Sequence, residues 1–451
     1  MNDGEIVSAD GSIGQGAAQE TTRTVRVFID RKATRQVITA FGGNFAISRF
    51  GDRDAQDSVG GHVLKNMPIG HARVGIPLKT FIKPSGDNYD AGHTSVKDVF
   101  RLMETLRDLK IPLVASVWDV PDFCVTNPEE TNGRRIAPDK RDKVIAAITE
   151  WVRLARERHG LTVPYVSFSQ ADTGYSLLVP PEEARYFITR GGAALQRIGF
   201  PTKWLLGDTS NGESLAPYIT TIMADKSVVP YLGPVSFHGW DSLTAPDDAY
   251  RAIAKAARLY RKPVWCLEAG YDAQLSKSDL SVWNTWDNAL KLAQSYARCL
   301  TLAEASVMDY WQYQNDFPIL GESDGVRNDT EVLSPSFVLY PAFHLIKMFA
   351  ETFPAETQIV SAKVVGDSIY AVVGTEPVAA KLRILLVNVG ESADVIVSGG
   401  QPNGKYSADG MHETQADREL SKVSLPLLGT DEKGTAVVSV LPRSVSVLRE
   451  Q

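Results

Sequence analysis

The sequence predicts an α/β fold, a (β/α)8 TIM barrel joined to a small antiparallel β-sandwich domain. Short apolar strands and amphipathic helices alternate eight times between residues 33 and 352. From residue 353 onward, helical periodicity gives way to short β-rich runs separated by turns. A period-two strand at 24–30 precedes the barrel and has no partner within it. These three features together predict two domains, with the N-terminal strand joining the second one.

The predicted barrel strands are short and apolar, at 38–42, 71–74, 113–117, 165–168, 204–207, 234–238, 264–267 and 307–310. Helical patterns separate most of them, at 99–109, 141–159, 181–198, 247–260 and 284–304. An open doubly wound sheet is the alternative. Residues 41–45, however, lack the Gly-x-Gly-x-x-Gly spacing of its phosphate-binding turn. The pattern therefore favours a closed barrel.

The domain boundaries follow from these changes of pattern. We expect a disordered tail at 1–21, an N-terminal strand at 22–32 that joins the β-sandwich, the barrel at 33–352 and the β-sandwich at 353–451. The β-rich runs of the last domain lie at 358–364, 368–373, 381–389, 394–397, 435–441 and 444–448. The N-terminal strand should pair with them, which would bring both ends of the chain into one domain.

Composition narrows the function classes. The net charge is −7, from 47 basic and 54 acidic residues, without the basic footprint of a nucleic-acid-binding protein. No apolar run reaches the roughly 18 residues that span a membrane, and the N-terminus lacks a signal-peptide pattern. The sequence thus predicts a cytoplasmic protein with no nucleic-acid or membrane partner. The three cysteines, Cys124, Cys266 and Cys299, show neither disulfide nor zinc spacing, so we expect no metal or cofactor.

Reactive groups of barrel enzymes lie at the C-terminal ends of the strands. The polar and aromatic residues expected there are Asn44, Arg73, Trp118, Asp119, Ser169, Gln170, Asp172, Asp208, His238, Trp240, Glu268 and Trp311. Indole rings stack on the apolar faces of sugars, and Asn, Asp, Arg and His bond hydroxyl groups. This set predicts a small-molecule partner, a glycoside or a sugar-like metabolite.

Glu268 ends an apolar strand, where a charged side chain is costly unless it has a partner. One interpretation is a reactive carboxylate, which Arg73 would orient and keep ionised. The other is a structural ion pair with Arg73. His238, on the neighbouring strand, is either part of the same site or a hydrogen-bonded core histidine.

The barrel resembles clan A glycoside hydrolases, most of all family 30, whose glucosylceramidase- and xylanase-like barrels carry a side β-domain. The matching segments span strands one, three, six, seven and eight, at 38–43, 115–121, 236–238, 265–268 and 310–313. The resemblance extends over roughly residues 24–450. It implies that Glu268 is the nucleophile of a retaining glycosidase and that the rim residues bind the sugar.

The end of strand four departs from the family pattern. The family has an Asn-Glu pair there, with Glu as acid/base and Asn contacting the sugar 2-hydroxyl, whereas this chain has Ser169-Gln170. A retaining hydrolase uses two carboxyl groups about 5–5.5 Å apart, and an amide cannot exchange the proton. Tyr175, in the loop that follows, is a further candidate for substrate contact. Without a carboxylic acid at 170, the basic limb of the usual pH profile should be missing, unless Asp172 has taken over as the acid.

Three interpretations of Gln170 stay open. It could be an engineered replacement of Glu, which would leave Ser169 unexplained. It could belong to a glycosidase for good leaving groups that need no proton, as in plant thioglucosidases with Gln at this position. The barrel could also be a non-hydrolytic enzyme or binding protein of intracellular secondary metabolism. Asp172 is either a substitute acid, if the strand continues past Gln170, or a structural residue that caps the loop.

Overall fold

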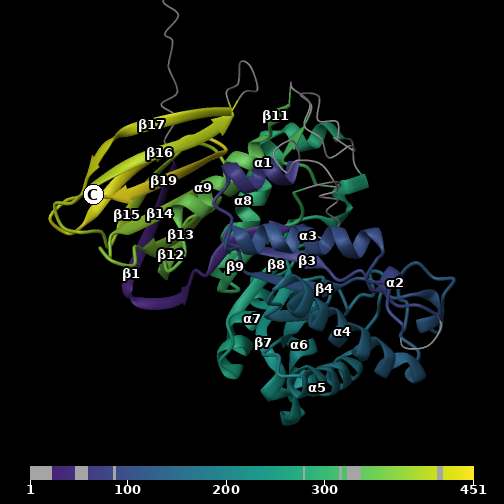
Figure 1. The fold of residues 1–451 in the computed structure, drawn as a ribbon. Coiled ribbons are helices and arrows are strands. Elements are labelled where there is room, and N and C mark those ends of the chain that lie inside the picture. The colour runs from purple at the N-terminus through teal and green to yellow at the C-terminus, as the bar shows by residue number, and fades with distance from the viewer. Residues whose placement is uncertain are drawn as a thin grey trace, which may run out of the picture.

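The fold is that of a computed structural model, which describes residues 23–45, 59–84, 88–277, 280–313, 317–321, 337–413 and 420–451. The tail expected at 1–21 lies outside the described residues. A closed eight-stranded barrel stands beside a nine-stranded sheet (Figure 1). The predicted fold class, a TIM barrel with a small β-domain, is confirmed.

The barrel strands run parallel and close between the last and the first. They are β2 (Ala40–Asn44), β3 (His71–Gly75), β4 (Leu113–Val117), β5 (Tyr165–Phe168), β6 (Lys203–Thr209), β7 (Leu232–His238), β8 (Val264–Ala269) and β9 (Ala305–Tyr310). Apolar side chains from four of them form a cluster of their own: Val114, Leu205, Trp265, Leu267 and Val307, with Tyr165 of β5 packed against it. Such layers fill a barrel of this size, so the polar groups of the site rest on a packed core.

Helices surround the barrel because their apolar stripes pack against the strands. They are α1 (Val59–Asn66), α2 (Leu78–Phe81), α3 (Thr94–Asp108), α4 (Arg141–His159), α5 (Pro181–Arg197), α6 (Gly212–Met223), α7 (Asp247–Tyr260), α8 (Trp286–Thr301) and α9 (Pro341–Thr352). Short 3-10 turns are η2 (Asp122–Cys124), η3 (Pro138–Lys140), η4 (Lys226–Tyr231), η5 (Ala273–Lys277) and η6 (Leu280–Asn284). Among the described segments, none of the helices has both the length and the apolar character to cross a bilayer.

The β-domain is one sheet in the order β17-β16-β19-β14-β13-β12-β1-β15-β18. Its strands are β1 (Arg23–Val37), β12 (Gln358–Val365), β13 (Ile369–Thr375), β14 (Leu382–Asn388), β15 (Ala393–Ser398), β16 (Lys405–Glu413), β17 (Leu420–Gly429), β18 (Thr435–Val440) and β19 (Ser444–Glu450). A small ribbon of β10 (Leu320–Gly321) and β11 (Val338–Leu339) lies apart from it.

Strand β1 lies between two strands from the other end of the chain. It pairs antiparallel with β12 and parallel with β15, and Figure 1 shows it in purple beside the green and yellow strands. It runs on to Val37, past the boundary at residue 32 that the sequence suggested. Alternate residues Val25, Val27 and Ile29 are buried in the core of the β-domain. Their period-two pattern explains why this segment forms a strand.

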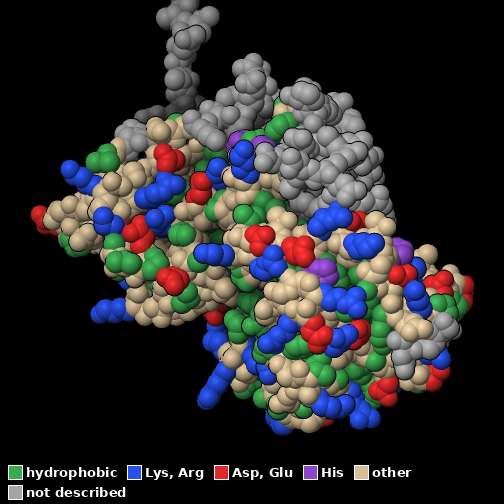
Figure 2. Space-filling model, viewed as in Figure 1, with side chains coloured by type: hydrophobic (Ala, Val, Ile, Leu, Met, Phe, Trp, Pro, Cys, Tyr) green, Lys and Arg blue, Asp and Glu red, His purple; other side chains and the backbone are tan. Residues whose placement is uncertain are grey.

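The surface shows no segregation of charge on the face seen in Figure 2. Lys and Arg side chains are interspersed with Asp and Glu over both domains. This agrees with the small net charge of −7. This face therefore presents no extended area of one sign to steer a charged partner.

Two irregularities in the barrel strands position the site. In β6 the register against β7 shifts between Gly207 and Thr209, and Gly207 and Asp208 have φ angles of 114° and 67°. A Cβ atom at Gly207 would lie 2.6 Å from the carbonyl oxygen of Ser236, so the turn needs glycine there. In β8, Leu267 is the extra residue, because Phe237 and His238 pair with Cys266 and Glu268. Bulges of this kind re-aim a side chain, and here they turn Asp208 and Glu268 into the barrel.

Candidate active site

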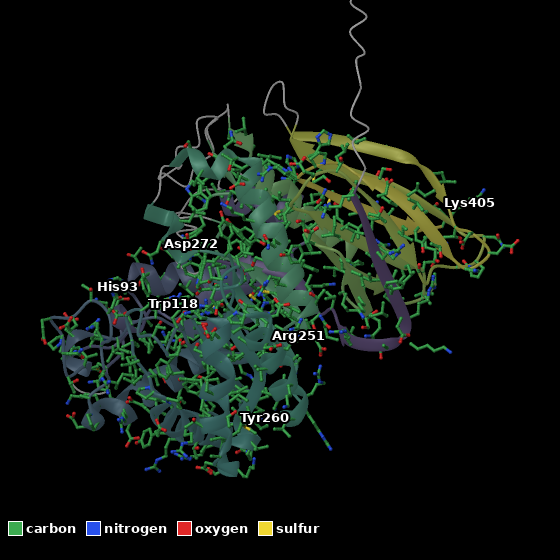
Figure 3. The ribbon with its side chains drawn as sticks, turned by 180° about the vertical axis from the view of Figure 1, so that it is seen from behind. His93, Trp118, Arg251, Tyr260, Asp272 and Lys405 are labelled. Atoms are coloured by element: carbon green, nitrogen blue, oxygen red, sulfur yellow. The ribbon has the colours of Figure 1, made fainter. Side chains whose placement is uncertain are left out.

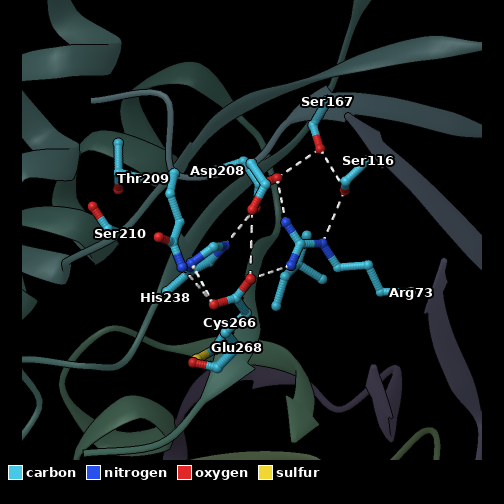
Figure 4. Close-up of polar contacts among 12 residues, drawn as sticks. Arg73, Ser116, Ser167, Asp208, Thr209, Ser210, His238, Cys266 and Glu268 are labelled. Carbon is cyan, nitrogen blue, oxygen red and sulfur yellow. Dashed lines mark hydrogen bonds and ion pairs between the residues drawn. The ribbon is translucent and has the colours of Figure 1, made fainter. Parts of the chain in front are cut away.

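The candidate site lies where the barrel strands end. Trp118 and Asp272, which follow β4 and β8, lie toward one end of the barrel, whereas Tyr260, which ends α7, lies toward the other (Figure 3). At the centre of the strand-end face are Arg73, Asp208, His238 and Glu268, each with no exposed surface. Figure 4 shows their polar contacts. Four ionisable groups buried together must compensate one another's charge.

Arg73 on β3 is the hub of this cluster. One terminal nitrogen lies 2.5 Å from Oε1 of Glu268, and the other lies 2.9 Å from Oδ2 of Asp208. Its Nε donates to the hydroxyl of Ser116 at 2.9 Å. The guanidinium also lies 4.4 Å from the centre of the Trp118 ring. Arg73 therefore bridges two carboxylates, and the ion pair with Glu268 that the sequence suggested is present.

Both oxygens of Glu268 are occupied by neighbouring groups. In addition to Arg73 on Oε1, the side-chain amide of Gln170 donates to Oε2 at 2.9 Å and the indole of Trp240 donates to it at 3.0 Å. Ser169 Oγ lies 3.5 Å from Oε1. Burial alone would raise the pKa of Glu268, but the charges of His238 and Arg73 outweigh it and lower the pKa below the ordinary value. Glu268 is thus held as a carboxylate.

Asp208 and His238 complete the cluster. Asp208 accepts from Ser167 Oγ at 2.6 Å, and its Oδ1 lies 3.0 Å from Nε2 of His238. The other ring nitrogen, Nδ1, lies 3.0 Å from Oε2 of Glu268, an ion-pair distance without hydrogen-bond alignment. Burial opposes ionisation of Asp208, but Arg73 and His238 outweigh it and lower the pKa of Asp208 to about 2.

The fourth strand of the barrel, β5, ends in a turn. Strand β5 stops at Phe168, and Gln170 has a φ angle of 51°, in the left-handed region. The N–H of Gln170 donates to the carbonyl oxygen of Asp208 at 3.0 Å, and its own carbonyl accepts from Gly174 at 3.1 Å. These bonds hold the Gln170 side chain against Glu268. The residue that replaces the expected acid therefore contacts the proposed nucleophile directly.

Asp172 does not follow Gln170 toward Glu268, because the strand does not continue. Its Oδ1 accepts from the N–H and hydroxyl of Ser210 at 2.8 and 2.9 Å, and its Oδ2 accepts from Ser214 at 2.6 Å. The loop after β5 is thereby fastened to the start of α6. This removes the geometric reason for treating Asp172 as a substitute acid and favours the structural interpretation.

Replacing Asp172 with Ala should lower the free energy of unfolding by about 1–3 kcal/mol, because the part-buried donors of Ser210 and Ser214 lose their acceptor. Asp108→Ala is the matched control, with a side chain that is 69% exposed, and should change stability by less than about 0.5 kcal/mol. Urea unfolding measures both. A fully stable Asp172→Ala protein that loses turnover of activated glycosides would restore Asp172 as an acid.

The aromatic candidates divide into two groups. Trp118 and Trp311 face each other, with ring centres 5.9 Å apart, and both are partly exposed. Trp240 is almost fully buried and is committed to Glu268. Tyr175 is 62% exposed on the loop after β5, and no contact ties it to the cluster. Of these four candidates, Trp118 therefore combines contact with Arg73 and a partly exposed ring, and Trp311 lies beside it.

Two of the polar candidates hold other parts of the site in position. The amide nitrogen of Asn44 donates to the carbonyl oxygens of Leu267 and Tyr310 at 2.7 and 3.1 Å, and its oxygen accepts from Arg73 at 3.2 Å. Asp119 forms ion pairs with Arg134 and Lys79. Asn44 thus orients Arg73, and Asp119, whose side chain is 21% exposed, anchors the loop after β4.

The sequence indicated Glu268, Arg73 and His238, and the structure brings them together. The sequence placed Asp208 at a strand end without indicating a role for it. In the structure, Asp208 contacts both Arg73 and His238. The signal was the same one that marks Glu268, a charged residue that ends an apolar strand. Ser116 and Ser167 carried no signal, because small polar residues are common in barrel strands. Their hydroxyls, 2.7 Å apart, link Arg73 to Asp208.

No group of three or more His, Cys, Asp or Glu side chains within the described ranges is arranged to hold a metal ion. Cavities of about 520 and 490 Å³ lie between the barrel and the β-domain, lined by residues such as Arg251 and Tyr370 in one and Phe343 and Met411 in the other. Neither cavity is lined by Glu268 or its partners. The site is therefore identified by the chemistry of its buried charges and not by a large hollow.

Comparison with known proteins finds solved structures that share the fold of this chain at low sequence identity. No protein-family model and no curated protein matches the chain. A family 30 subfamily 8 xylanase from Clostridium acetobutylicum superposes with a TM-score of 0.70, at 16% identity over 94% of this chain and 99% of the other. SrfJ from Salmonella typhimurium has a TM-score of 0.70, at 14% identity over 96% and 93%.

A second xylanase of family 30 also superposes on this chain. The catalytic domain of GH30 xylanase C from Talaromyces cellulolyticus has a TM-score of 0.69, at 16% identity over 94% of this chain and 100% of the other. These likenesses extend over barrel and β-domain together. The protein thus has the two-domain fold of family 30 glycoside hydrolases and related clan A glycosidases.

Proposed function

We propose that the protein is a glycosidase-type enzyme in which Glu268 attacks glycosides whose leaving group departs without a proton. One observation carries the proposal. An ionised carboxylate stands at the end of β8, and the amide of Gln170 lies 2.9 Å from it where a proton donor would be needed. The lowered pKa of Glu268, caused by His238 and Arg73 against the effect of burial, keeps it nucleophilic at neutral pH.

The reaction follows from these groups. An oxygen of Glu268 forms a bond to the anomeric carbon while the glycosidic bond breaks, and the aglycone leaves with the electron pair. Water then hydrolyses the glycosyl ester, releases Glu268 and gives its proton to solvent. Because Glu268 has no exposed surface, the substrate must first displace a group that contacts it, and in this proposal that group is the Gln170 amide on Oε2. Trp118 and Trp311 supply ring faces for the sugar.

A panel of aryl glycosides that differ in sugar and leaving group tests the proposal. We expect turnover of 2,4-dinitrophenyl glycosides, a steep loss of rate as the phenol becomes more basic, and no turnover by Glu268→Gln. Azide should accelerate turnover, because an anion needs no general base to attack the glycosyl ester. If no sugar of the panel is released at a rate above that of Glu268→Gln, the hydrolytic proposal fails.

A second function is favoured by one specific observation. Arg73, Ser169, Gln170, Trp240 and His238 all contact the carboxylate of Glu268. A group so fully engaged also suits a protein that binds a glycoside or sugar-like metabolite without cleaving it. Calorimetry distinguishes the two functions. Binding of a glycoside without turnover, retained in Glu268→Gln, would support the binding protein.

A further inference from the structure

The buried cluster is balanced in charge only in one protonation state. Asp208 and Glu268 contribute two negative charges, and Arg73 contributes one positive charge. All three, together with His238, have no exposed surface. The cluster is neutral only when His238 carries two protons. A buried net charge is costly, so the geometry itself favours the imidazolium form of His238.

Each ring nitrogen of His238 faces a carboxylate. Nε2 lies 3.0 Å from Oδ1 of Asp208, and Nδ1 lies 3.0 Å from Oε2 of Glu268. A neutral imidazole has one bare nitrogen lone pair. With its proton on the Asp208 side, the bare Nδ1 would lie 3.0 Å from a negatively charged oxygen of Glu268, without the alignment of a hydrogen bond. The charged groups that face His238 are Asp208 from β6 and Glu268 from β8, with Arg73 from β3 between the two carboxylates.

Asp208 is fixed so that it cannot turn away from the ring. Its Oδ2 accepts from Arg73 at 2.9 Å and from Ser167 at 2.6 Å, which leaves Oδ1 for His238. The bulge at Gly207 and the left-handed backbone at Asp208 aim this side chain inward. Such backbone conformations persist only where surrounding contacts hold them. The arrangement is therefore built around the Asp208–His238 contact.

We propose that Asp208 is a positioning residue that holds His238 as an imidazolium, and that this cation in turn keeps Glu268 charged and available for attack. The first half stands on the geometry of the cluster alone. The second half rests on the proposed function, in which Glu268 is the nucleophile. Neither Gln170 nor Asp172 takes part in it.

The proposal predicts that turnover falls at high pH because His238 loses its proton. Burial would lower the pKa of His238, but Glu268 and Asp208 outweigh it and raise the pKa above 6.5. Loss of the His238 proton would leave the buried cluster with a net negative charge and remove the cation beside Glu268, so turnover should decline as pH rises through the His238 value in the folded protein. The sequence alone predicted that the basic limit is missing because position 170 has no carboxylic acid, whereas this proposal predicts a basic limit that comes from His238. Stability should follow the same direction, because a raised histidine pKa stabilises the fold at low pH and ceases to do so above it.

The direct test is a pH titration of the protein labelled with ¹³C at histidine Cε1, followed by NMR. The chain has seven histidines, and His238→Gln assigns the relevant signal. We expect the His238 signal to keep its imidazolium shift past pH 6.5 and to titrate at least about 1 pH unit lower in Asp208→Asn, the change typical for loss of one neighbouring opposite charge. Glu268→Gln should lower the midpoint as well.

The controls separate a specific effect from general damage. His71 on β3 has its own buried partner, Asp309, at 2.7 Å, and its signal should not move in Asp208→Asn. Asn is among the residues that tolerate positive φ, so this variant keeps the local backbone. If Asp208→Asn does not fold, Glu268→Gln provides the same test, because it removes the negative charge near the other ring nitrogen of His238.

Two outcomes would overturn the proposal. One is a wild-type His238 that titrates at or below about 6.5, the value of a free histidine. The other is a midpoint that stays the same in both Asp208→Asn and Glu268→Gln. The titration needs no substrate, so it fails or succeeds independently of the hydrolytic function. Where an activated glycoside is turned over, the basic limit of kcat/KM should move down with the His238 midpoint in Asp208→Asn.

Discussion

Replacing Gln170 with Glu should raise the turnover of glycosides with poor leaving groups by about 10²–10⁴-fold, the usual contribution of a general acid–base group. The new carboxyl would lie beside Glu268, where Gln170 Nε2 now lies 2.9 Å from Oε2. The neighbouring negative charge raises the pKa of the new acid, so it would hold a proton near neutral pH. Initial rates with phenyl and alkyl glycosides measure the gain.

The gain should depend on the leaving group. Dinitrophenyl glycosides need no proton, so their first step should change little. Gln196→Glu is the matched control, since it adds the same charge at an exposed position on α5 and should leave all rates unchanged. If Gln170→Glu folds and cleaves activated glycosides but gains nothing with poor leaving groups, position 170 is not the acid position of this barrel.

Arg73→Met should lower the free energy of unfolding by about 3–5 kcal/mol, the cost of leaving buried charges without their partner. Arg73 contacts Glu268 and Asp208 at 2.5 and 2.9 Å with no exposure on any of the three side chains. Removal of the guanidinium leaves two carboxylates facing one histidine. The loss should shrink as pH falls, because protonation then neutralises the carboxylates. Denaturant unfolding at pH 7 and pH 5 measures both effects.

Arg251→Met gives the comparison, because Arg251 also bonds two carboxylates, Asp247 and Asp248 at 3.0 and 2.8 Å, but is 54% exposed. Surface ion pairs contribute at most about 1 kcal/mol. The triple variant Arg73→Met, Asp208→Asn, Glu268→Gln should recover part of the stability that Arg73→Met loses. Equal losses for Arg73→Met and Arg251→Met would show that the buried cluster does not depend on Arg73.

The barrel could be predicted because each strand is a short, continuous apolar run, the pattern of strands covered on both faces. Strand β1 could be predicted from its alternation and its lack of a barrel partner. Strands β16 and β17 could not, because segments such as 405–413 alternate poorly in the sequence. Helix α1 has Gly60 and Gly61, and α6 contains Pro217. These residues disfavour helices, and packing against the barrel overrides that preference.

The residue types of the site could be predicted from the sequence, but the arrangement of these residues in space could not. A charged residue that ends an apolar strand indicated Glu268, and the same reasoning applies to Asp208. Which way such a residue points depends on bulges at Gly207 and Leu267, and period-two alternation cannot show them. The assignment of Asp172 depended on a straight strand past Gln170. The left-handed φ of 51° at Gln170 ends that strand and sends Asp172 to Ser210 and Ser214.

The most direct test of the central claim is to identify the residue that becomes covalently attached to the sugar. The protein would be treated with 2,4-dinitrophenyl 2-deoxy-2-fluoro glycosides of the sugars that it turns over, digested at low pH and sequenced by mass spectrometry. The account predicts one glycosyl group per chain, located on Glu268, removed by azide and absent from Glu268→Gln. A label on another residue, or release of dinitrophenol without any label on Glu268, would contradict it.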